Sequence, residues 1–299
     1  MRIRTALSVT AMAAASVLVL SGCMDSDNPG TTDPDPETTE EFEAVPYEEG
    51  TTMAELAEAG TMTVGTKFDQ PLFGLESPDG TPEGFDVEIA KIIGKHLGLA
   101  PEDIEFVEAV SQNREPFIES GTVDIVVATY TINDARKEVV SFAGPYYIAG
   151  QDILVPAGNP EGIDGPEWFA DNPDATVCTV SGSTSLENIK EYTDNILEAA
   201  GYSDCLEPIR NGDAVALTTD NVILSGLAAQ NEGEFELVNN PFTEEPYGIG
   251  LAKDDVEFRM WINDVLEASY DNGDWAAAWD ATIGDVLNRP EPPQVDRYE

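Results

Sequence analysis

The chain has 299 residues, and its 58 acidic residues against 14 lysines and arginines give a formal net charge of −44. Such a charge repels nucleic acids and anionic lipid headgroups, so we expect neither as a partner. The acidity fits either a solvated coat suited to salty surroundings or a cation-binding surface. We favour the coat, because no compact aspartate loop of the calcium-binding kind occurs, and we expect no metal site and no cofactor.

The first residues predict export. Arg2 and Arg4 precede an apolar run at residues 11–20 that is followed by small residues, which is the pattern of a secretory signal peptide. The run is too short to span a membrane comfortably. Residues 20–23 (Leu-Ser-Gly-Cys) resemble the bacterial lipobox, in which the cysteine becomes the lipidated N-terminus. We therefore expect a lipoprotein signal peptide at residues 1–22 and a lipid on Cys23, with a chance cysteine after an ordinary signal as the alternative. The protein would then be anchored at the extracellular face of the cell membrane.

A tether follows the predicted anchor. Residues 25–50 are rich in Asp, Glu, Thr and Pro and contain few apolar side chains. Such a segment cannot bury enough surface to offset the entropy of ordering its chain. We assign residues 23–52 to the lipidated cysteine and an acidic, flexible tether.

Short apolar runs then alternate with helical patterns from residue 53 to about residue 289, which predicts α/β architecture with parallel sheets in one large or two small lobes. The first set has expected strands at 61–66, 104–107 and 123–128 and helices at 85–97 and 115–120. The second set has expected strands at 153–156, 176–180 and 214–218 and helices at 185–199 and 222–230. A strand at 247–252 and helices at 256–270 and 275–287 end the pattern.

Polar side chains gather where three of these strands end. Thr129, Thr131 and Arg136 follow the first, residues 181–185 (Ser-Gly-Ser-Thr-Ser) the second, and residues 218–220 (Thr-Thr-Asp) the third. In open α/β sheets, ligands bind beyond the carboxyl ends of strands, where helix N-termini offer free N–H groups. Hydroxyls and an arginine fork suit a carboxylate, and an aspartate suits an ammonium, so the clusters predict a receptor for a zwitterion. Taken singly, Thr129, Ser185 and Asp220 also suit helix caps, and Arg136 suits a surface ion pair.

Residues 65–90 (GTKFDQPLFGLESPDGTPEGFDVEIA), the stretch TINDARK that contains Arg136, and residues 215–226 (VALTTDNVILSG) resemble the extracellular solute-binding proteins of amino-acid ABC importers, family 3. The resemblance covers about residues 56–287. It implies a type II periplasmic-binding fold, in which two α/β lobes joined by two hinge strands close on a ligand. We place the crossings near Gly150 and Asn240, with lobe one at 53–150 and 241–290, lobe two at 151–240, and a polar tail at 291–299. It also implies a monomer that works with the permease of an ABC importer.

The resemblance implies a role for each matched residue. Arg136 matches the arginine that grips the α-carboxylate of the ligand, and Thr129 and Thr131 match the residues that bind the α-ammonium and α-carboxylate beside it. Ser183 and Thr184 match the lobe-two loop that closes on the carboxylate. Asp220 matches the aspartate that takes the α-ammonium.

Two further cations indicate the side chain of the ligand. Lys67 follows the first strand, and Arg114 lies in residues 111–114 (SQNR), a combination that resembles acidic amino-acid binders. Because Arg136 serves one carboxylate, Lys67 and Arg114 are available for a second, and we expect L-glutamate with aspartate second. Their neighbours Gln70 and Ser111 are further candidates for ligand contact. The alternative is that Lys67 and Arg114 neutralise nearby acids such as Asp69, Glu108 and Glu115.

The other two cysteines and the other function classes complete the expectations. Once Cys23 carries lipid, Cys178 and Cys205 form an even pair, which in an exported domain predicts a disulfide, with two buried thiols as the alternative. Another polar amino acid such as glutamine is the alternative ligand. An enzyme on the same fold, such as a cyclohexadienyl dehydratase, would need a positioned acid or base. The lone histidine and the match to the ammonium-binding pattern weigh against it, so we expect a binding protein and no catalytic residues.

Overall fold

The structure is a computed structural model, and it describes residues 47–298. The predicted signal peptide, the predicted lipidation site Cys23 and the tether up to residue 46 lie outside the described residues. None of the helices within residues 47–298 has the length and apolar character needed to cross a membrane.

Lobe one is the part of the chain built on the first five-stranded sheet, in which the strands lie in the order β5-β1-β6-β13-β7. Strand β1 pairs in parallel with β5 and β6, whereas β13 pairs antiparallel with β6 and β7. A small antiparallel sheet of β2, β3 and β4 follows β1 in the chain. The strands are β1 (Met62–Thr66), β2 (Asp69–Gln70), β3 (Gly74–Glu76), β4 (Pro82–Glu83), β5 (Ile104–Glu108), β6 (Ile125–Val126), β7 (Ser141–Ala149) and β13 (Glu245–Leu251). The helices are α1 (Thr52–Ala59), α2 (Phe85–His96), α3 (Arg114–Glu119), α4 (Asp134–Lys137), α9 (Val256–Asn272) and α10 (Asp274–Thr282), with short 3-10 turns at Pro101–Asp103 and Ser111–Asn113.

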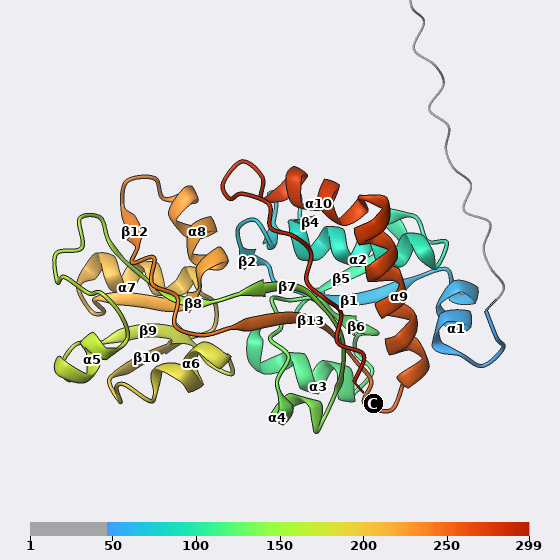
Figure 1. Cartoon of the computed structure of the whole chain (residues 1–299), viewed down its shortest axis with the longest axis horizontal. Helices are drawn as coiled ribbons and strands as arrows, with labels where there is room; N and C mark the ends of the chain where they lie inside the picture. The colour runs from blue at the N-terminus through green and yellow to red at the C-terminus, as the bar shows by residue number, and fades with distance from the viewer. Residues whose placement is uncertain (1–46, 299) are drawn as a thin grey trace, which may run out of the picture. The chain divides into compact units, whose positions relative to one another are not determined.

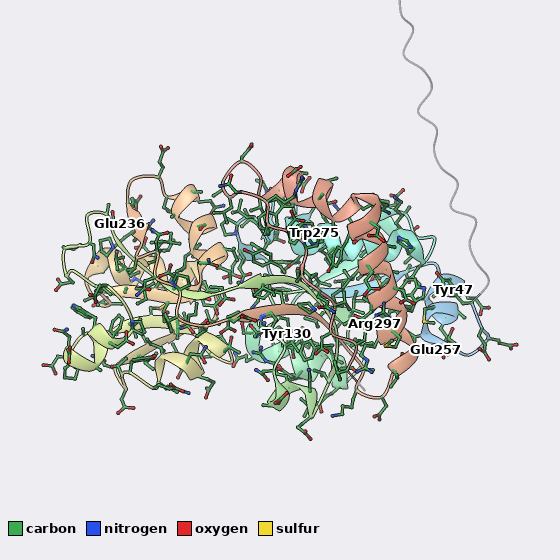
Figure 2. The ribbon with its side chains drawn as sticks, in the orientation of Figure 1. Tyr47, Tyr130, Glu236, Glu257, Trp275 and Arg297 are labelled. Atoms are coloured by element: carbon green, nitrogen blue, oxygen red, sulfur yellow. A yellow bond between two sulfur atoms is a disulfide. The ribbon has the colours of Figure 1, made fainter. Side chains whose placement is uncertain are left out.

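Aromatic side chains pack helix α2 against helix α10. Phe85 opens α2, and its ring meets those of Trp275 and Trp279 edge-on at 5.7 and 5.4 Å (Figure 2 labels Trp275). Such edge-to-face contacts add to the free energy gained by burying the rings. The packing ties α10, at the end of the chain, to α2 in the same lobe (Figure 1).

Lobe two is built on the second sheet, in the order β10-β9-β11-β8-β12. Strand β9 pairs in parallel with β10 and β11, and β8 pairs antiparallel with β11 and β12. The elements are β8 (Gln151–Pro156), α5 (Glu167–Asp171), β9 (Val177–Val180), α6 (Thr184–Ile189), β10 (Ile196–Ala199), a 3-10 turn at Ser203–Cys205, α7 (Leu206–Asn211), β11 (Ala216–Asp220), α8 (Asn221–Gln230) and β12 (Phe235–Leu237).

The chain passes between the two sheets twice. Gly150 alone separates β7 from β8, and the return runs from the end of β12 at Leu237 to the start of β13 at Glu245 (Figure 1). The two connections touch, because the backbone N–H of Gln151 donates to Thr243 Oγ1 at 3.0 Å. A Cβ on Gly150 would lie only 2.9 Å from the Thr243 carbonyl oxygen, so this close approach requires glycine. The prediction of two α/β lobes joined by two connections is confirmed.

Three predictions about the elements and sheets were wrong or incomplete. The helix expected at 185–199 is only α6, and its second half is strand β10, where Ile196 pairs with Val177 of β9. The turn-forming residues Thr193, Asp194 and Asn195 break the helical pattern, and pairing with β9 decides the rest. Strand β7 was not predicted, since Gly and Pro interrupt its apolar pattern. The sheets are also mixed rather than purely parallel.

The predicted disulfide is present. Cys178 of β9 is bonded to Cys205 in the 3-10 turn before α7, and both residues belong to lobe two. The bond therefore fixes the loop that follows β10 to strand β9 of the second sheet.

Candidate functional site

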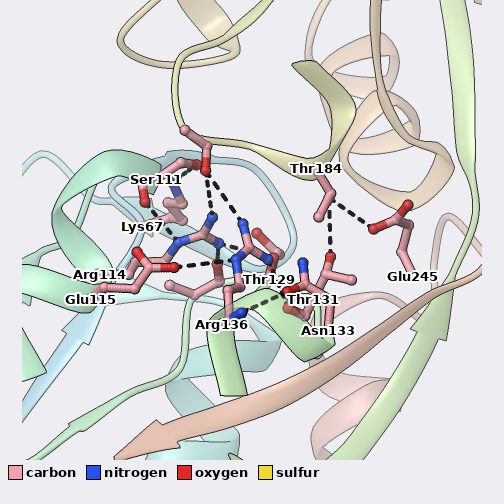
Figure 3. Close-up of polar contacts among 12 residues, drawn as sticks. Lys67, Ser111, Arg114, Glu115, Thr129, Thr131, Asn133, Arg136, Thr184 and Glu245 are labelled. Atoms are coloured by element: carbon pink, nitrogen blue, oxygen red, sulfur yellow. Dashed lines mark hydrogen bonds and ion pairs between the residues drawn. The ribbon is translucent and has the colours of Figure 1, made fainter. Parts of the chain in front are cut away.

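Three cations predicted from the sequence lie together at the edge of lobe one. Lys67 directly follows β1, Arg114 begins α3, and Arg136 lies in α4, all of them where strands of the first sheet end (Figure 3). Their exposed fractions are 3%, 3% and 8%. The guanidiniums of Arg114 and Arg136 lie over the ring of Tyr130, at 4.3 and 4.9 Å from its centre. Buried cations of this kind need anionic partners or several hydrogen bonds to offset their desolvation.

Carbonyl oxygens hold Arg114. Its Nε donates to the Ser111 carbonyl at 3.1 Å, and one terminal nitrogen donates to the carbonyls of Ala128 and Thr129 at 3.1 and 3.3 Å. Its other terminal nitrogen points across to lobe two, 3.5 Å from the carbonyl of Gly182. These partners orient the guanidinium, and its charge partly offsets the burial that raises the pKa of the Asp86 and Asp220 carboxyls.

Arg136 has one carboxylate partner. Its Nε lies 3.2 Å from Glu115, and one terminal nitrogen donates to the Thr131 carbonyl at 2.7 Å. The other terminal nitrogen lies 3.3 Å from Gly182 O, so both arginines converge on this lobe-two carbonyl. Burial, and then the neighbouring Arg114, lower the pKa of Arg136 to about 10, which still leaves it charged at neutral pH. Arg136 is thus a buried cation and not the surface ion pair of the alternative interpretation.

Lys67 lies beside the arginines. Its ammonium donates to Ser111 Oγ at 2.9 Å, which brings a second predicted residue into the cluster. Burial, followed by repulsion from Arg114, lowers the pKa of Lys67 to about 7. Within residues 47–298, neither Lys67 nor Arg114 forms an ion pair with a carboxylate at contact distance. The charges of Asp69 and Asp86 act on Lys67 from farther away and favour its charged form, which keeps neutralisation by nearby acids as the alternative.

The two threonines that follow β6 contact different partners. Thr129 has φ +43°, in the left-handed region, and its backbone N–H donates to Asp86 at 2.8 Å. Its hydroxyl donates to Gln70 Oε1 at 3.0 Å, while the amide nitrogen of Gln70 is buried without a partner. The Thr131 hydroxyl lies 3.4 Å from that of Thr184 in lobe two, so it faces the opposite lobe. Gln70, Thr129 and Thr131 are all buried in the same region as the cations.

In the loop before α6, the two predicted hydroxyls differ. Ser183 is the N-cap of α6, since its Oγ accepts from the Leu186 N–H at 3.0 Å and donates to the Val180 carbonyl at 2.7 Å. Its hydroxyl is therefore committed to the helix, as N-cap residues usually are. Thr184 Oγ1 donates to Glu245 at 2.8 Å and faces Thr131.

Asp220 ends β11 at the N-cap position of α8, but its side chain makes no capping hydrogen bond. One carboxylate oxygen accepts from the Tyr247 hydroxyl at 2.5 Å, and the other is buried with no hydrogen-bond partner among residues 47–298. Burial, and then the charge of Glu245, raise the pKa of Asp220 to about 7. An orphaned, buried carboxylate oxygen of this kind suits a positively charged ligand group.

Sequence reasoning missed two acids of this region. Asp86, fully buried in α2, accepts from the Tyr146 hydroxyl at 2.6 Å as well as from Thr129 N–H, and burial raises its pKa to about 7. Its place in the GFD motif was the available signal. Glu245, buried at the start of β13, accepts from Thr184 at 2.8 Å and from Asn188 at 3.1 Å. Nothing in its sequence context marked it, because only the return between the lobes brings it to α6.

Residues 47–298 contain no group of three His, Cys, Asp or Glu side chains that could hold a metal ion. Lobe one contributes the buried arginines, which point to the Gly182 carbonyl, and the Thr131 hydroxyl, which faces Thr184. Lobe two contributes the buried carboxylate of Asp220. This is the chemistry of a site for a molecule with both charges.

Comparison with known proteins places the chain among binding proteins. It is 38% identical over 240 residues to the glutamate-binding protein GluB of Corynebacterium efficiens, covering 76% of this chain and 80% of the relative. It is 37% identical over 225 residues to the ABC transporter glutamine-binding protein GlnH of Bacillus subtilis, covering 74% of this chain and 81% of the relative.

A solved structure of a solute receptor for L-cysteine from Neisseria gonorrhoeae superposes with a TM-score of 0.74 at 29% identity, over 81% of this chain and 98% of that one. The relatives are named as binding proteins, in agreement with the prediction of a transport protein rather than an enzyme. The model of the bacterial extracellular solute-binding proteins, family 3, matches residues 62–283. The chain belongs to that family.

Proposed function

We propose that the protein captures an acidic amino acid between its two lobes, L-glutamate first and aspartate second, and delivers it to the permease of an ABC importer. The observation that carries this proposal is the set of three buried cations, of which, among residues 47–298, only Arg136 forms an ion pair with a carboxylate. One α-carboxylate uses one arginine fork, and the remaining two cations suit a second carboxylate.

The proposed arrangement uses both lobes. The α-carboxylate lies against Arg136, with the hydroxyl of Thr131 and the backbone of Thr184, whose own hydroxyl donates to Glu245. The α-ammonium lies against Asp220 and Thr129. The backbone of the loop at Ser183 lines the carboxylate, since its hydroxyl already caps α6. The side-chain carboxylate lies against Lys67, Arg114, Gln70 and Ser111. Residues 53–150 and 241–290 form the first closing body and residues 151–240 the second.

The rest of the proposal concerns the setting. The protein acts as a monomer held at the extracellular face of the cell membrane by a lipid on Cys23, with residues 23–52 as its tether. The family is extracellular, and the tether gives the binding domain reach toward the permease. Mass spectrometry of the membrane-extracted protein tests the lipid, since an unmodified Cys23 contradicts the anchor.

Calorimetric titration with glutamate, aspartate, glutamine and arginine tests the ligand. We expect glutamate to bind most tightly. Glutamine is the alternative to an acidic ligand, because a glutamine-binding relative is almost as similar in sequence as the glutamate-binding one. Glutamine or arginine binding far more tightly than glutamate refutes the acidic ligand, and no binding of any amino acid refutes the receptor.

A further inference from the structure

The lobes also touch outside the candidate site. In lobe one, Asp69 of β2 accepts a hydrogen bond from the backbone N–H of Tyr202 in lobe two at 2.7 Å. A Cβ on Gly201 would lie 2.5 Å from the same carboxylate oxygen, and a Cβ on Gly226 would lie 2.5 Å from the carbonyl oxygen of Pro71. We call these five residues the closure contact. At Gly226 the close atom belongs to the backbone, so a larger residue there would push the lobes apart. At Gly201 the close atom is the Asp69 carboxylate, which would have to turn away and give up its bond to Tyr202.

The lobe-two side of the closure contact is anchored internally. Tyr202 is 4% exposed, and its hydroxyl lies 3.5 Å from Ser185 Oγ, which donates to Thr219 Oγ1 at 3.1 Å. The disulfide between Cys205 and Cys178 ties the same loop to β9. The Tyr202 N–H that meets Asp69 is therefore held in place before the lobes meet, and less entropy is lost when the bond forms.

The anchoring also links the closure contact to the ligand site. Thr219 directly precedes Asp220, and burial together with the charge of Asp220 raises the pKa of Tyr202. The backbone of Tyr202 meets lobe one while its side chain reaches the hydroxyls next to the proposed ammonium acceptor. Neither Asp69 nor Tyr202 was among the residues predicted to bind ligand.

The hydrogen bond of Asp69 exists only while the lobes are together. It joins a carboxylate to a backbone N–H, a charge-assisted bond of the stronger kind. A contact made only in the closed state favours closure, and a ligand held between the lobes then leaves more slowly.

We propose that Asp69 is a positioning residue that latches the lobes from outside the ligand site, so that the lifetime of the bound ligand depends on the closure contact as well as on direct ligand contacts. This inference rests on the proposed function. The glycines at 201 and 226 permit the latch to form, and the disulfide-anchored loop receives it.

The first test removes the acceptor in the full chain. Asp69→Ala is expected to weaken glutamate binding by about 10-fold, mostly through faster dissociation in stopped-flow experiments. Asp69→Asn keeps an acceptor oxygen but, like Asp69→Ala, removes the charge that acts on Lys67. Recovery of most of the lost lifetime in Asp69→Asn is expected, and it separates the hydrogen bond from that charge. Asp103→Ala is the matched control, since Asp103 accepts from the Ala100 N–H at 3.1 Å wholly within lobe one. The Asp103→Ala variant is expected to release glutamate at the wild-type rate.

The second test uses the close approach of Gly201 to the Asp69 carboxylate. Gly201→Ala is expected to speed ligand dissociation by at least about 10-fold and to reduce the compaction that glutamate produces in X-ray scattering. In the Asp69→Ala background the clashing oxygen is gone, and the nearest remaining atom, Asp69 Cβ, lies 3.5 Å away. In that background, Gly201→Ala should change the dissociation rate of the ligand very little further, because the effects of substitutions at contacting residues are not additive. Thermal unfolding of each ligand-free variant checks that the lobes remain folded.

The outcomes separate the two proposals. Wild-type binding of glutamate with unchanged dissociation in Asp69→Ala, or with additive effects of the two substitutions, overturns the latch and leaves the proposed function intact. No binding of any amino acid by wild type overturns the proposed function, and the role of the latch in ligand retention falls with it.

Discussion

Lys67 offers a direct measure of whether the ligand carries a second carboxylate. Its ammonium is buried beside Arg114, and its pKa of about 7 means that about half of the ligand-free molecules carry the charge at pH 7. A carboxylate placed against Lys67 stabilises the charged form and raises this pKa. Binding of glutamate should therefore take up protons from solution.

The size of the uptake follows from the titration curve. With a free-state pKa of about 7 and a bound-state pKa well above it, Lys67 takes up about 0.1 proton at pH 6, about 0.5 at pH 7 and about 0.9 at pH 8. Because protons are taken up, the affinity for glutamate that depends on Lys67 falls as the pH rises above 7. Glutamine has no side-chain carboxylate and should cause no uptake at Lys67.

Calorimetry in buffers of different ionisation enthalpy counts these protons. The comparison is between wild type and Lys67→Met, which keeps an unbranched apolar side chain of similar length and cannot ionise. Asp220 also titrates near pH 7 and is present in both proteins. Burial raises the pKa of Asp86 to about 7 and the charge of Lys67 opposes this rise, so the substitution also changes the titration of Asp86, and the same comparison made with glutamine measures that contribution. Identical proton counts for the two proteins at pH 7 and pH 8 would refute a ligand carboxylate at Lys67.

Three further predictions concern single features of the fold and the site. Arg136→Ala should weaken glutamate binding by about 2–5 kcal/mol in calorimetry, whereas Lys137→Ala on the surface should leave it unchanged, and equal effects would contradict the clamp. Asp220→Asn should weaken binding more at pH 8 than at pH 6, because with a pKa of about 7 the wild-type carboxyl is already largely protonated at pH 6; an equal ratio of affinities at the two values would argue against ammonium binding there. Replacing Cys178 and Cys205 together by serine should lower the free energy of unfolding in urea by about 2–4 kcal/mol, and an unchanged midpoint would show that the bond does not stabilise the fold.

The α/β architecture could be read from local patterns because burial periodicity is a local property. Helix α2 has its apolar residues on one face, and strand β1 is a short buried run bounded by polar residues. The predicted site residues lie together because strand ends of a parallel arrangement share one edge of a sheet. Lys67 after β1 and Arg114 after β5 meet for this reason, and β1 pairs in parallel with β5.

Local sequence patterns gave a wrong or missing prediction where contacts between distant segments decide the structure. Residues 196–199 carry no strong strand signal, and they become β10 because β9 offers a parallel partner. Glu245 reaches Thr184 only because the second connection between the lobes returns beside α6.

By itself, the sequence determined the predicted site residues, without Asp86 and Glu245, and the order of the elements apart from β7 and β10, since residue type, burial period and strand-end position are encoded along the chain. It also supplied the cysteine pair and the family resemblance. Only the tertiary structure decided which charges remain without a partner and which surfaces of the two lobes meet. The reason is that desolvation, ion pairing and the contact of Asp69 with Tyr202 depend on distances between segments far apart in the chain.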